Sequence, residues 1–154
     1  MIRPLAPADA EACDAIVLTL PYHFGNERGR TECARAVRSQ EGLVAVEAGE
    51  VVGFLTLERH DPRSAEITWM AVRADRRRRG IGRRLVERAV DDLSCDGVEL
   101  LSVLTLAESE PEERETDNYA DTRAFYRRAG FVAVRELALE GWDDRALMLV
   151  RSVP

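Results

Sequence analysis

VRADRRRRGIGRRL, the stretch Val72–Leu85, joins an apolar segment typical of a β-strand to an amphipathic segment typical of an α-helix. The two glycines between them, Gly80 and Gly82, let the backbone approach a ligand closely. The first turn of the helix presents unpaired N–H groups and the positive end of the helix dipole, and the arginines add fixed charge. The stretch therefore predicts a site for phosphate groups, and a pyrophosphate would fit it well.

Two common glycine-rich phosphate loops do not match this stretch. A P-loop requires a lysine after its last glycine, and the chain contains no lysine. A dinucleotide fingerprint requires a third glycine or alanine where Leu85 stands and an acidic residue where Ser102 lies. The remaining pattern, Arg77-x-x-Gly80-x-Gly82, resembles the coenzyme A pyrophosphate motif of the GNAT superfamily of acyl-CoA-dependent N-acyltransferases.

The charge distribution favours a compact anion site over a nucleic-acid surface. Seven of the 22 basic residues lie between Arg73 and Arg84, but the chain has 28 acidic residues and a net charge of −6. Nucleic-acid binding requires a broader positive surface, and no second basic cluster extends this one. We therefore expect one small anionic ligand and no nucleic-acid partner.

Length and composition indicate one domain of enzyme size over residues 1–154. A chain of this length buries about two-thirds of its unfolded surface around one core. Met1–Pro4 lacks an apolar signal core, and the longest apolar runs, such as Val51–Leu57, are too short to span a membrane. We expect a cytoplasmic protein without a membrane partner.

Cysteine and histidine residues show no metal-binding pattern. The three cysteines are scattered and form no CxxC pair, which predicts reduced and mostly buried thiols. His23 and His60 are isolated, and no HExxH motif is present. The sequence thus predicts neither a disulfide nor a metal site.

The hydrophobic pattern alternates strands with helices. It predicts a β-hairpin around Ala48–Glu50, a helix stop near Gly97 and another at Gly130. The expected strands are Met1–Pro4, Val44–Glu47, Val51–Glu58, Ala65–Arg73, Val98–Leu106, Phe131–Leu137 and Arg145–Arg151, and the expected helices are Pro7–Leu18, Asn26–Ser39, a segment from Ile81 to about Asp96, and Tyr119–Ala129.

This order predicts an α/β fold in a single domain, with a mixed central sheet of about six or seven strands flanked on both faces by about four helices. The strand after each crossover helix should run parallel to the strand before it. Ligands of such sheets bind beyond the carboxyl ends of the strands, where the glycine turn follows Ala65–Arg73. The acidic segment Ala107–Asp117 is expected to be a mobile loop.

A second block strengthens the resemblance. Asn118–Phe131, with the sequence NYADTRAFYRRAGF, is similar to the GNAT segment in which an Ala-Phe-Tyr helix ends in Gly-Phe. Ala65–Val72 is similar to the family's central strand, and Val51–Phe54 to the strand before it. On these motifs the chain is identified as a member of the GNAT superfamily, which implies an acetyl-CoA-dependent N-acetyltransferase with a GNAT-like fold.

The resemblance implies direct attack of an amine on the thioester of acetyl-CoA. Such a reaction needs an unprotonated amine, donors for the oxyanion and a proton for the departing thiolate. The family pattern makes Tyr126 the general acid, and the ordinary pKa of a phenol, about 10, is close to that of an alkyl thiol. The alternative is that Tyr126 only packs against Phe125 and Phe131.

Two residues are candidates for the general base. Glu66 is the first, since the family often places a carboxylate on this strand; the alternative is a rim glutamate paired with an arginine. His23 is the second, in a loop that borders the acceptor site in many relatives; a solvent-facing or capping histidine is the alternative. Tyr22, His23 and Phe24 are expected to bind the acceptor.

Coenzyme A is expected along the central strand and the glycine turn. By resemblance, backbone groups of Met70, Ala71 and Val72 meet the oxyanion and the pantetheine amides. Arg84 is expected to face water, and Arg127 or Arg128 to reach the 3′-phosphate. The other predicted cofactor-binding residues are Arg77, Arg78, Arg79, Gly80, Ile81, Gly82, Arg83, Asn118, Tyr119, which replaces an asparagine of many relatives, and Thr122.

The acceptor is expected to be a small-molecule or protein amine. The acidic segment Ala107–Asp117, with Asp143 and Asp144, favours a cationic amine such as a polyamine, an aminoglycoside or a lysine-like group. The alternative is that the acidic segment only keeps the protein soluble. Tyr22, Phe24 and Trp142 would then form an apolar acceptor pocket.

Two functions of the protein stay open, and so do two roles of its last strand. A catalytically silent acyl-CoA-binding or sensing module is the alternative to an enzyme, although a pure binder would need neither Tyr126 nor Glu66. The apolar run Ala146–Val150 fits either a homodimer contact or a central buried strand.

Overall fold

One mixed sheet of seven strands organises the computed structural model, which describes residues 1–154. The strands are β1 (Ile2–Pro4), β2 (Glu41–Glu47), β3 (Glu50–Asp61), β4 (Ser64–Val72), β5 (Leu100–Leu106), β6 (Val132–Leu137) and β7 (Ala146–Ser152). They lie in the order β1-β2-β3-β4-β5-β7-β6, and only β4 and β5 are parallel neighbours. The predicted α/β class with a mixed sheet of about seven strands is confirmed.

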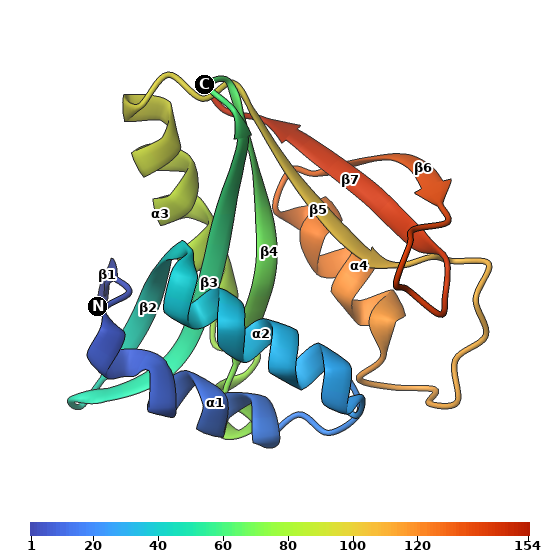
Figure 1. Cartoon of the computed structure of the whole chain (residues 1–154), viewed down its shortest axis with the longest axis horizontal. Helices are drawn as coiled ribbons and strands as arrows, with labels where there is room; N and C mark the ends of the chain where they lie inside the picture. The colour runs from blue at the N-terminus through green and yellow to red at the C-terminus, as the bar shows by residue number, and fades with distance from the viewer.

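Four helices cover the two faces of the sheet, as predicted (Figure 1). α1 (Ala10–Leu18) and α2 (Glu27–Ser39) pack on one face, and α3 (Ile81–Cys95) and α4 (Tyr119–Arg128) pack on the other. Short 3₁₀ turns, η1 (Pro7–Asp9) and η2 (Ala74–Arg76), precede α1 and α3. None of these helices combines the length and the hydrophobicity needed to cross a bilayer.

β3 is apolar at consecutive positions because it is buried on both faces. Successive side chains of a strand point to opposite faces. Phe54 accordingly packs in the hydrophobic cluster under α1 and α2, and Leu55 packs in the larger cluster under α3 and α4. The hairpin predicted before this strand is confirmed, with both turn residues, Ala48 and Gly49, at positive φ of 49° and 78°. Such a two-residue turn matches the twist of the strands that it joins.

β4 and β5 separate halfway along their length. They pair only from Ser64, opposite Leu100, to Ile67, opposite Val103, although β4 continues to Val72. At the point of separation, Thr68 is an extra residue relative to β3, which forms a bulge. The hydroxyl of Thr68 is hydrogen-bonded to Thr56 at 2.7 Å and to Gln40 at 2.5 Å, which fixes the bulge. Beyond it, the two strands diverge and leave a gap between them (Figure 1).

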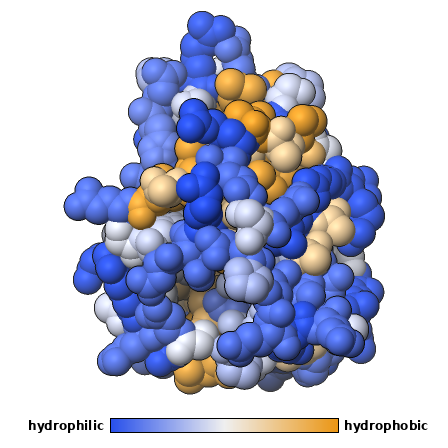
Figure 2. All heavy atoms as spheres, turned by 90° about the vertical axis from the view of Figure 1, so that its right-hand side faces the viewer, coloured by the Kyte–Doolittle hydropathy of each residue, from blue (hydrophilic) through white to orange (hydrophobic).

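β7 occupies the middle of the C-terminal half of the sheet. It is inserted between β5 and β6 and runs antiparallel to both, so β6, the strand that follows α4, runs parallel to β5 as predicted, without pairing with it. β1 and β2, which flank α1 and α2, are antiparallel instead. Of the two roles considered for Ala146–Val150, the structure selects the central strand. The free edge belongs to β6, where Val132 and Val134 are 67% and 53% exposed. Figure 2 faces this side and shows hydrophobic residues gathered in its upper part; the homodimer stays a prediction.

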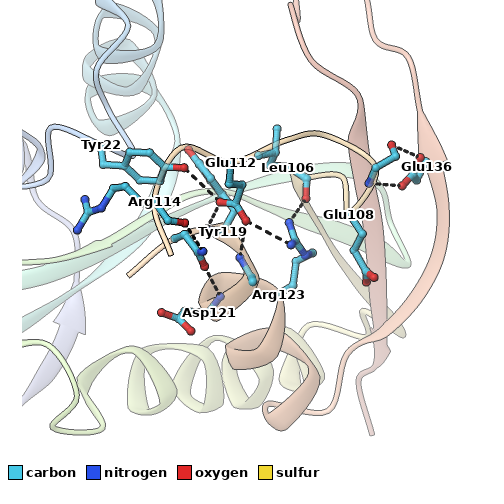
Figure 3. Close-up of polar contacts among 12 residues, drawn as sticks. Tyr22, Leu106, Glu108, Glu112, Arg114, Tyr119, Asp121, Arg123 and Glu136 are labelled. Carbon is cyan, nitrogen blue, oxygen red and sulfur yellow. Dashed lines mark hydrogen bonds and ion pairs between the residues drawn. The ribbon is translucent and has the colours of Figure 1, made fainter. Parts of the chain in front are cut away.

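The acidic segment between β5 and α4 is held in place by the carboxylate of Glu112, whose side chain is only 11% exposed (Figure 3). Its oxygens accept hydrogen bonds from the backbone N–H groups of Tyr119 and Ala120 at 2.6 and 3.2 Å, and from the hydroxyl of Tyr22 at 3.3 Å. Arg123, which is itself buried, lies 3.5 Å from this carboxylate and donates to the carbonyl of Leu106. Glu112 thus caps α4 and joins it to the loop after α1.

Further contacts tie the same segment to the rest of the fold. Ser109 donates to Glu136 on β6 at 2.8 Å (Figure 3). Glu108 forms an ion pair with Arg127 on α4. Asp117, at the end of the segment, forms an ion pair with Arg77. This network argues against the predicted mobility of the loop and leaves fewer of its carboxylates free to attract a ligand.

Replacing Glu112 should destabilise the fold far more than replacing its neighbour. We expect Glu112→Gln to lower the free energy of unfolding by about 1–3 kcal/mol, because a neutral amide leaves buried donors poorly satisfied. The exposed Glu113 is the matched control, and Glu113→Gln should change stability by less than about 0.5 kcal/mol. Urea unfolding followed by circular dichroism measures both values. Equal effects of the two substitutions would contradict the proposed capping role.

Candidate active site

A cleft fills the gap between the separated strands. Its volume is about 1220 Å³. Met70–Val72 of β4 lie on one wall and Val103–Leu106 of β5 on the other. The cleft extends from the N-terminus of α3 to the loop that follows α1, and residues Trp142–Asp144 of the loop between β6 and β7 also line it. Segments distant in the sequence therefore meet around one elongated hollow.

The N-terminus of α3 opens onto the cleft with an unusual charge pattern. Gly80 caps the helix at a φ of 79°, and no side chain accepts a hydrogen bond from the first turn. The other three helices each carry an acidic residue in the first turn, whereas α3 has none and carries Arg83 and Arg84 there. Arginines next to the positive end of a helix dipole are unfavourable unless an anion binds among them. The turn is thus well suited to hold phosphate groups.

The arginines of this turn differ in their partners. Arg77 is paired with Asp117, and Arg78 lies 4.0 Å from Asp121. Arg83 lines the cleft, whereas Arg84 is directed away from it and lies 3.8 Å from Glu47, as expected for a residue facing water. Among the other predicted phosphate contacts, Gly80, Ile81, Gly82 and Arg128 line the cleft, Arg79 does not, and Arg127 is engaged by Glu108.

Gly82 lets α4 approach the start of α3. A Cβ atom at this position would lie 3.3 Å from Cζ of Phe125 on α4, closer than ordinary van der Waals contact. The glycine therefore has a packing role in addition to exposing the backbone. The close approach brings the next residue of α4, Tyr126, to the cleft wall.

Tyr126 is a core residue with its ring at the cleft. It is buried between Phe125 and Phe131, whose ring centroids lie 5.1 and 5.3 Å away in edge-to-face orientation. Burial raises the pKa of its hydroxyl above the ordinary value. The phenol is therefore protonated at neutral pH. The structure shows the packing against Phe125 and Phe131 and places Tyr126 at the cleft, and its role as a general acid stays a prediction.

Glu66 reaches the cleft from β4. Its side chain is 18% exposed, and its carboxylate lies 2.7 Å from Nε2 of His60 rather than beside an arginine. The alternative of a rim glutamate paired with an arginine is therefore not what the structure shows. His60 was not among the predicted site residues, because only strand pairing brings it near Glu66.

The backbone of β4 offers unpaired polar groups to the cleft. Arg73 donates its N–H to the carbonyl of Val52 on β3 at 2.8 Å. Since backbone groups of a strand alternate in direction, Ala71 also faces β3, and Met70 and Val72 face the gap. The alternation favours Met70 and Val72 over Ala71 as backbone partners of a ligand.

The three residues predicted to bind the acceptor, Tyr22, His23 and Phe24, have different surroundings in the loop that follows α1. Phe24 is buried and packs on Trp69, with ring centroids 5.9 Å apart. The guanidinium of Arg114 lies over the ring of Tyr22, with its Cζ atom 4.8 Å from the centroid of that ring. His23 packs edge-on against Tyr119, whose hydroxyl donates to the carbonyl of His23 at 3.1 Å. All three line the cleft, as does Tyr119.

The imidazole of His23 has a buried nitrogen, Nε2, without a hydrogen-bond partner. Burial lowers its pKa below 6.5, and the positive charge of Arg77 lowers it further. His23 is therefore neutral at pH 7. It lies beside the arginines that precede α3, in a second, smaller pocket of about 460 Å³ that includes Arg77 and Arg114.

The start of α4 contains the last predicted ligand contacts. Asn118 is buried and caps the helix, since its side-chain oxygen accepts from the N–H of Asp121 at 3.3 Å and its amide donates to the carbonyl of Arg114 at 2.7 Å. Its side chain is thus engaged within the chain. Thr122 lines the cleft one turn further along α4. The roles of both residues towards coenzyme A stay predictions.

Comparison with protein families identifies the fold. A family model described as an acetyltransferase (GNAT) domain matches residues 38–133, from the end of α2 to the start of β6. The chain belongs to the GNAT family of acetyltransferases. The match includes the glycine turn, the separated strands and α4, so it covers Gly80, Gly82, Glu66 and Tyr126 of this GNAT domain.

Solved structures agree with this assignment of the fold. A protein assigned to the GNAT family from Desulfovibrio desulfuricans superposes with a TM-score of 0.83 at 23% identity, over 100% of this chain and 99% of that one. An aminoglycoside 6′-N-acetyltransferase from Enterococcus faecium gives 0.75 at 19% identity, over 100% and 97%. A GNAT acetyltransferase from Elizabethkingia anophelis with acetyl-CoA bound gives 0.68 at 17% identity, over 99% and 97%. A comparison with curated protein sequences found no match.

The protonation of His23 can be tested directly. We expect its imidazole to titrate below pH 6.5 in an NMR pH titration, with His23→Gln used for assignment. The unfolded chain then binds this proton at a higher pH than the folded GNAT domain does. The contribution of His23 to stability is therefore fully present above pH 6.5 and is lost as the pH falls through the folded pKa, and His23→Gln should weaken this dependence. Titration of His23 at or above pH 6.5 would contradict its burial beside Arg77.

Proposed function

We propose that this GNAT domain is an N-acetyltransferase that transfers the acetyl group of acetyl-CoA to a primary amine by direct attack. One observation carries the proposal. The cleft between β4 and β5 begins at the uncapped, arginine-rich N-terminus of α3 and contains both Tyr126 and Glu66. Phosphate binding, a proton donor and a proton acceptor are thereby combined in one hollow.

The acetyl donor would be held by backbone groups and arginines. The free N–H groups at the start of α3 and the Arg83 guanidinium suit a pyrophosphate. To bind there, the ligand must also compete with Asp117 for Arg77. The backbone groups of Met70 and Val72 suit the pantetheine amides, because these groups have lost their partners in β5.

Tyr126 is the proposed general acid. Its raised pKa keeps the phenol protonated at neutral pH, so a proton is available when the thiolate departs. The surrounding aromatic rings exclude water from it and restrict its orientation. The cost is that the buried phenol is a weaker acid than a phenol in water, so it donates only as negative charge develops on sulfur.

Glu66 is the proposed general base. Its carboxylate lies on the cleft wall, partly exposed, so it can accept a proton from an incoming ammonium group directly or through water. No cysteine is placed for covalent catalysis: burial raises the pKa of the Cys13 and Cys33 thiols to about 12, and Cys95 is exposed at the far end of α3. Direct transfer is therefore favoured over an acyl-enzyme.

The acceptor is proposed to be a cationic amine. Glu32, Glu113, Asp143 and Asp144 line the cleft together with Glu66. Several carboxylates around a partly enclosed hollow attract a positively charged ligand. The similarity in fold to an aminoglycoside acetyltransferase agrees with a cationic amine, although it does not identify one.

Arg83 and Arg84 provide a matched pair of substitutions for donor binding. We expect Arg83→Gln to weaken acetyl-CoA binding by about tenfold, since a charge-assisted hydrogen bond is worth about 1.5–3 kcal/mol and this one is partly exposed. Arg84→Gln should leave binding unchanged, because Arg84 faces Glu47. Titration calorimetry with acetyl-CoA measures both, with ATP and NAD as reference ligands. No acetyl-CoA binding by the unaltered protein would overturn the proposed function.

Tyr126→Phe separates an enzyme from a silent acyl-CoA-binding module. The substitution retains the ring packing and removes the proposed proton donor. We expect turnover to fall by about 100-fold or more while acetyl-CoA affinity stays the same. Release of free thiol with a panel of cationic, neutral and acidic amines, at low and high salt, measures turnover.

The same assay tests the acceptor class. Cationic amines should be preferred, and their advantage should decrease at high salt as the carboxylates are screened. Arg84→Gln, which alters a residue that faces Glu47 away from the cleft, serves as the control substitution. A preference for neutral amines would contradict the acceptor proposal, and full turnover of Tyr126→Phe would exclude Tyr126 as the acid.

A further inference from the structure

Three potential metal ligands meet on one face of the sheet, where the sequence analysis expected none. Glu58 on β3 lies directly opposite Glu66 on β4, and His60 is two residues further along β3. Nε2 of His60 is 2.7 Å from Oε1 of Glu66. One donor atom from each of the three side chains lies within 4.8 Å of the other two.

This arrangement lacks a compensating positive charge. Like charges directly opposite each other on neighbouring strands destabilise a sheet. The nearest arginine in sequence, Arg59, is not available to offset them, because Glu41 and Asp96 hold its guanidinium at 2.9 and 2.7 Å. Arg63, just beyond β3, is likewise paired with Glu99. The imidazole of His60 is therefore the only side-chain partner of Glu66, and Glu58 forms no ion pair.

The donor set suits a transition-metal ion. We propose that Glu58, His60 and Glu66 bind one zinc ion or a similar divalent metal, and that the bound ion withdraws Glu66 from its role as a base. One imidazole nitrogen and two carboxylate oxygens form a recognised zinc ligand set, whereas magnesium and calcium prefer oxygen ligands alone. Donors about 2 Å from a common ion are roughly 3–4 Å apart, so small side-chain rotations suffice.

The position of the three residues gives access to the ion. His60 is 49% exposed and Glu66 is 18% exposed, which leaves room for a water molecule as a fourth ligand. Glu58 and Glu66 are a directly opposed pair of β3 and β4, and His60 is the extra residue of a bulge between Arg59 and Asp61. Spacing rules along the sequence did not reveal the site, because the third ligand comes from a different strand.

The effect on activity rests on the proposed function, but the metal site does not. Glu66 lines the cleft, and a metal-bound carboxylate accepts a proton less readily because the ion holds its lone pairs. The phosphate-binding turn lies beyond the other end of β4. Zinc should therefore inhibit turnover without weakening acetyl-CoA binding.

Titration calorimetry with zinc chloride, after treatment with a chelator and its removal, tests the site. We expect one saturable zinc site, no comparable binding of magnesium, and at least about tenfold weaker zinc binding in His60→Ala and Glu58→Gln, since even residues that only support metal ligands contribute this much. Cys95→Ser is the matched control, because Cys95 is the exposed thiol of the chain, and it should bind zinc normally. The proposed site would be overturned if the unaltered protein bound no zinc saturably, if His60→Ala bound zinc equally well, or if Cys95→Ser lost zinc binding.

Thiol-release assays with and without zinc complete the test. Zinc should inhibit the unaltered protein, a chelator should reverse the inhibition, and His60→Ala should be resistant at the same zinc concentration. Inhibition that persists in His60→Ala would overturn the link to Glu66. Failure of the proposed function is distinguishable, since it would appear as absent turnover and absent acetyl-CoA binding in the presence of chelator, while the zinc titration would still report on the site.

Discussion

The separation of β4 from β5 after Ile67 is the constraint on which the rest of the site depends. Parallel neighbours normally satisfy each other's backbone groups, and a strand that loses its neighbour must find other partners. Here the bulge at Thr68, held by Thr56 and Gln40, ends the pairing at a defined residue. The same bulge that weakens the sheet creates a cleft with polar backbone groups along one wall.

Charged residues of both signs line this cleft. The uncapped start of α3 concentrates arginines beside the positive end of a helix dipole. Carboxylates from α2 and from the loop between β6 and β7 also line the cleft. In the arginine-rich turn, Arg77 is held by Asp117, so an anionic ligand would replace an internal partner rather than bind a bare arginine. The affinity of the turn for an anion therefore depends on how much more strongly Arg77 pairs with the ligand than with Asp117.

Buried polar groups connect stability with the proposed chemistry. Glu112 caps α4 and fixes the position of the helix that carries Tyr126. Tyr126 in turn belongs to the same hydrophobic cluster as Leu85 of α3 and Leu149 of β7. The orientation of the proposed acid is thus set by the packing of the whole domain. Glu66, by contrast, lies at the partly exposed face where His60 and Glu58 can modify its environment.

Local patterns in the sequence determined the class of fold and the position of the glycine turn proposed to bind phosphate. Hydrophobic periodicity reports on burial within a few residues, so it identified the strands, the four helices and the hairpin at Ala48–Gly49. The glycines and arginines of Arg77–Gly82 likewise lie within a few residues of each other at the start of α3. This motif could therefore be recognised from the sequence alone.

Only the tertiary structure decided the contacts that cross between segments. The insertion of β7 between β5 and β6, the anchoring of the acidic loop by Glu112 and Arg123, and the approach of His60 and Glu58 to Glu66 all depend on strand order and register. No local pattern encodes them, because the partners are separated along the chain. The sequence alone therefore predicted the glycine and arginine residues of the turn before α3. The pairing of strands determined which side chains surround Glu66 and Tyr126, because proximity there results from packing of the whole sheet.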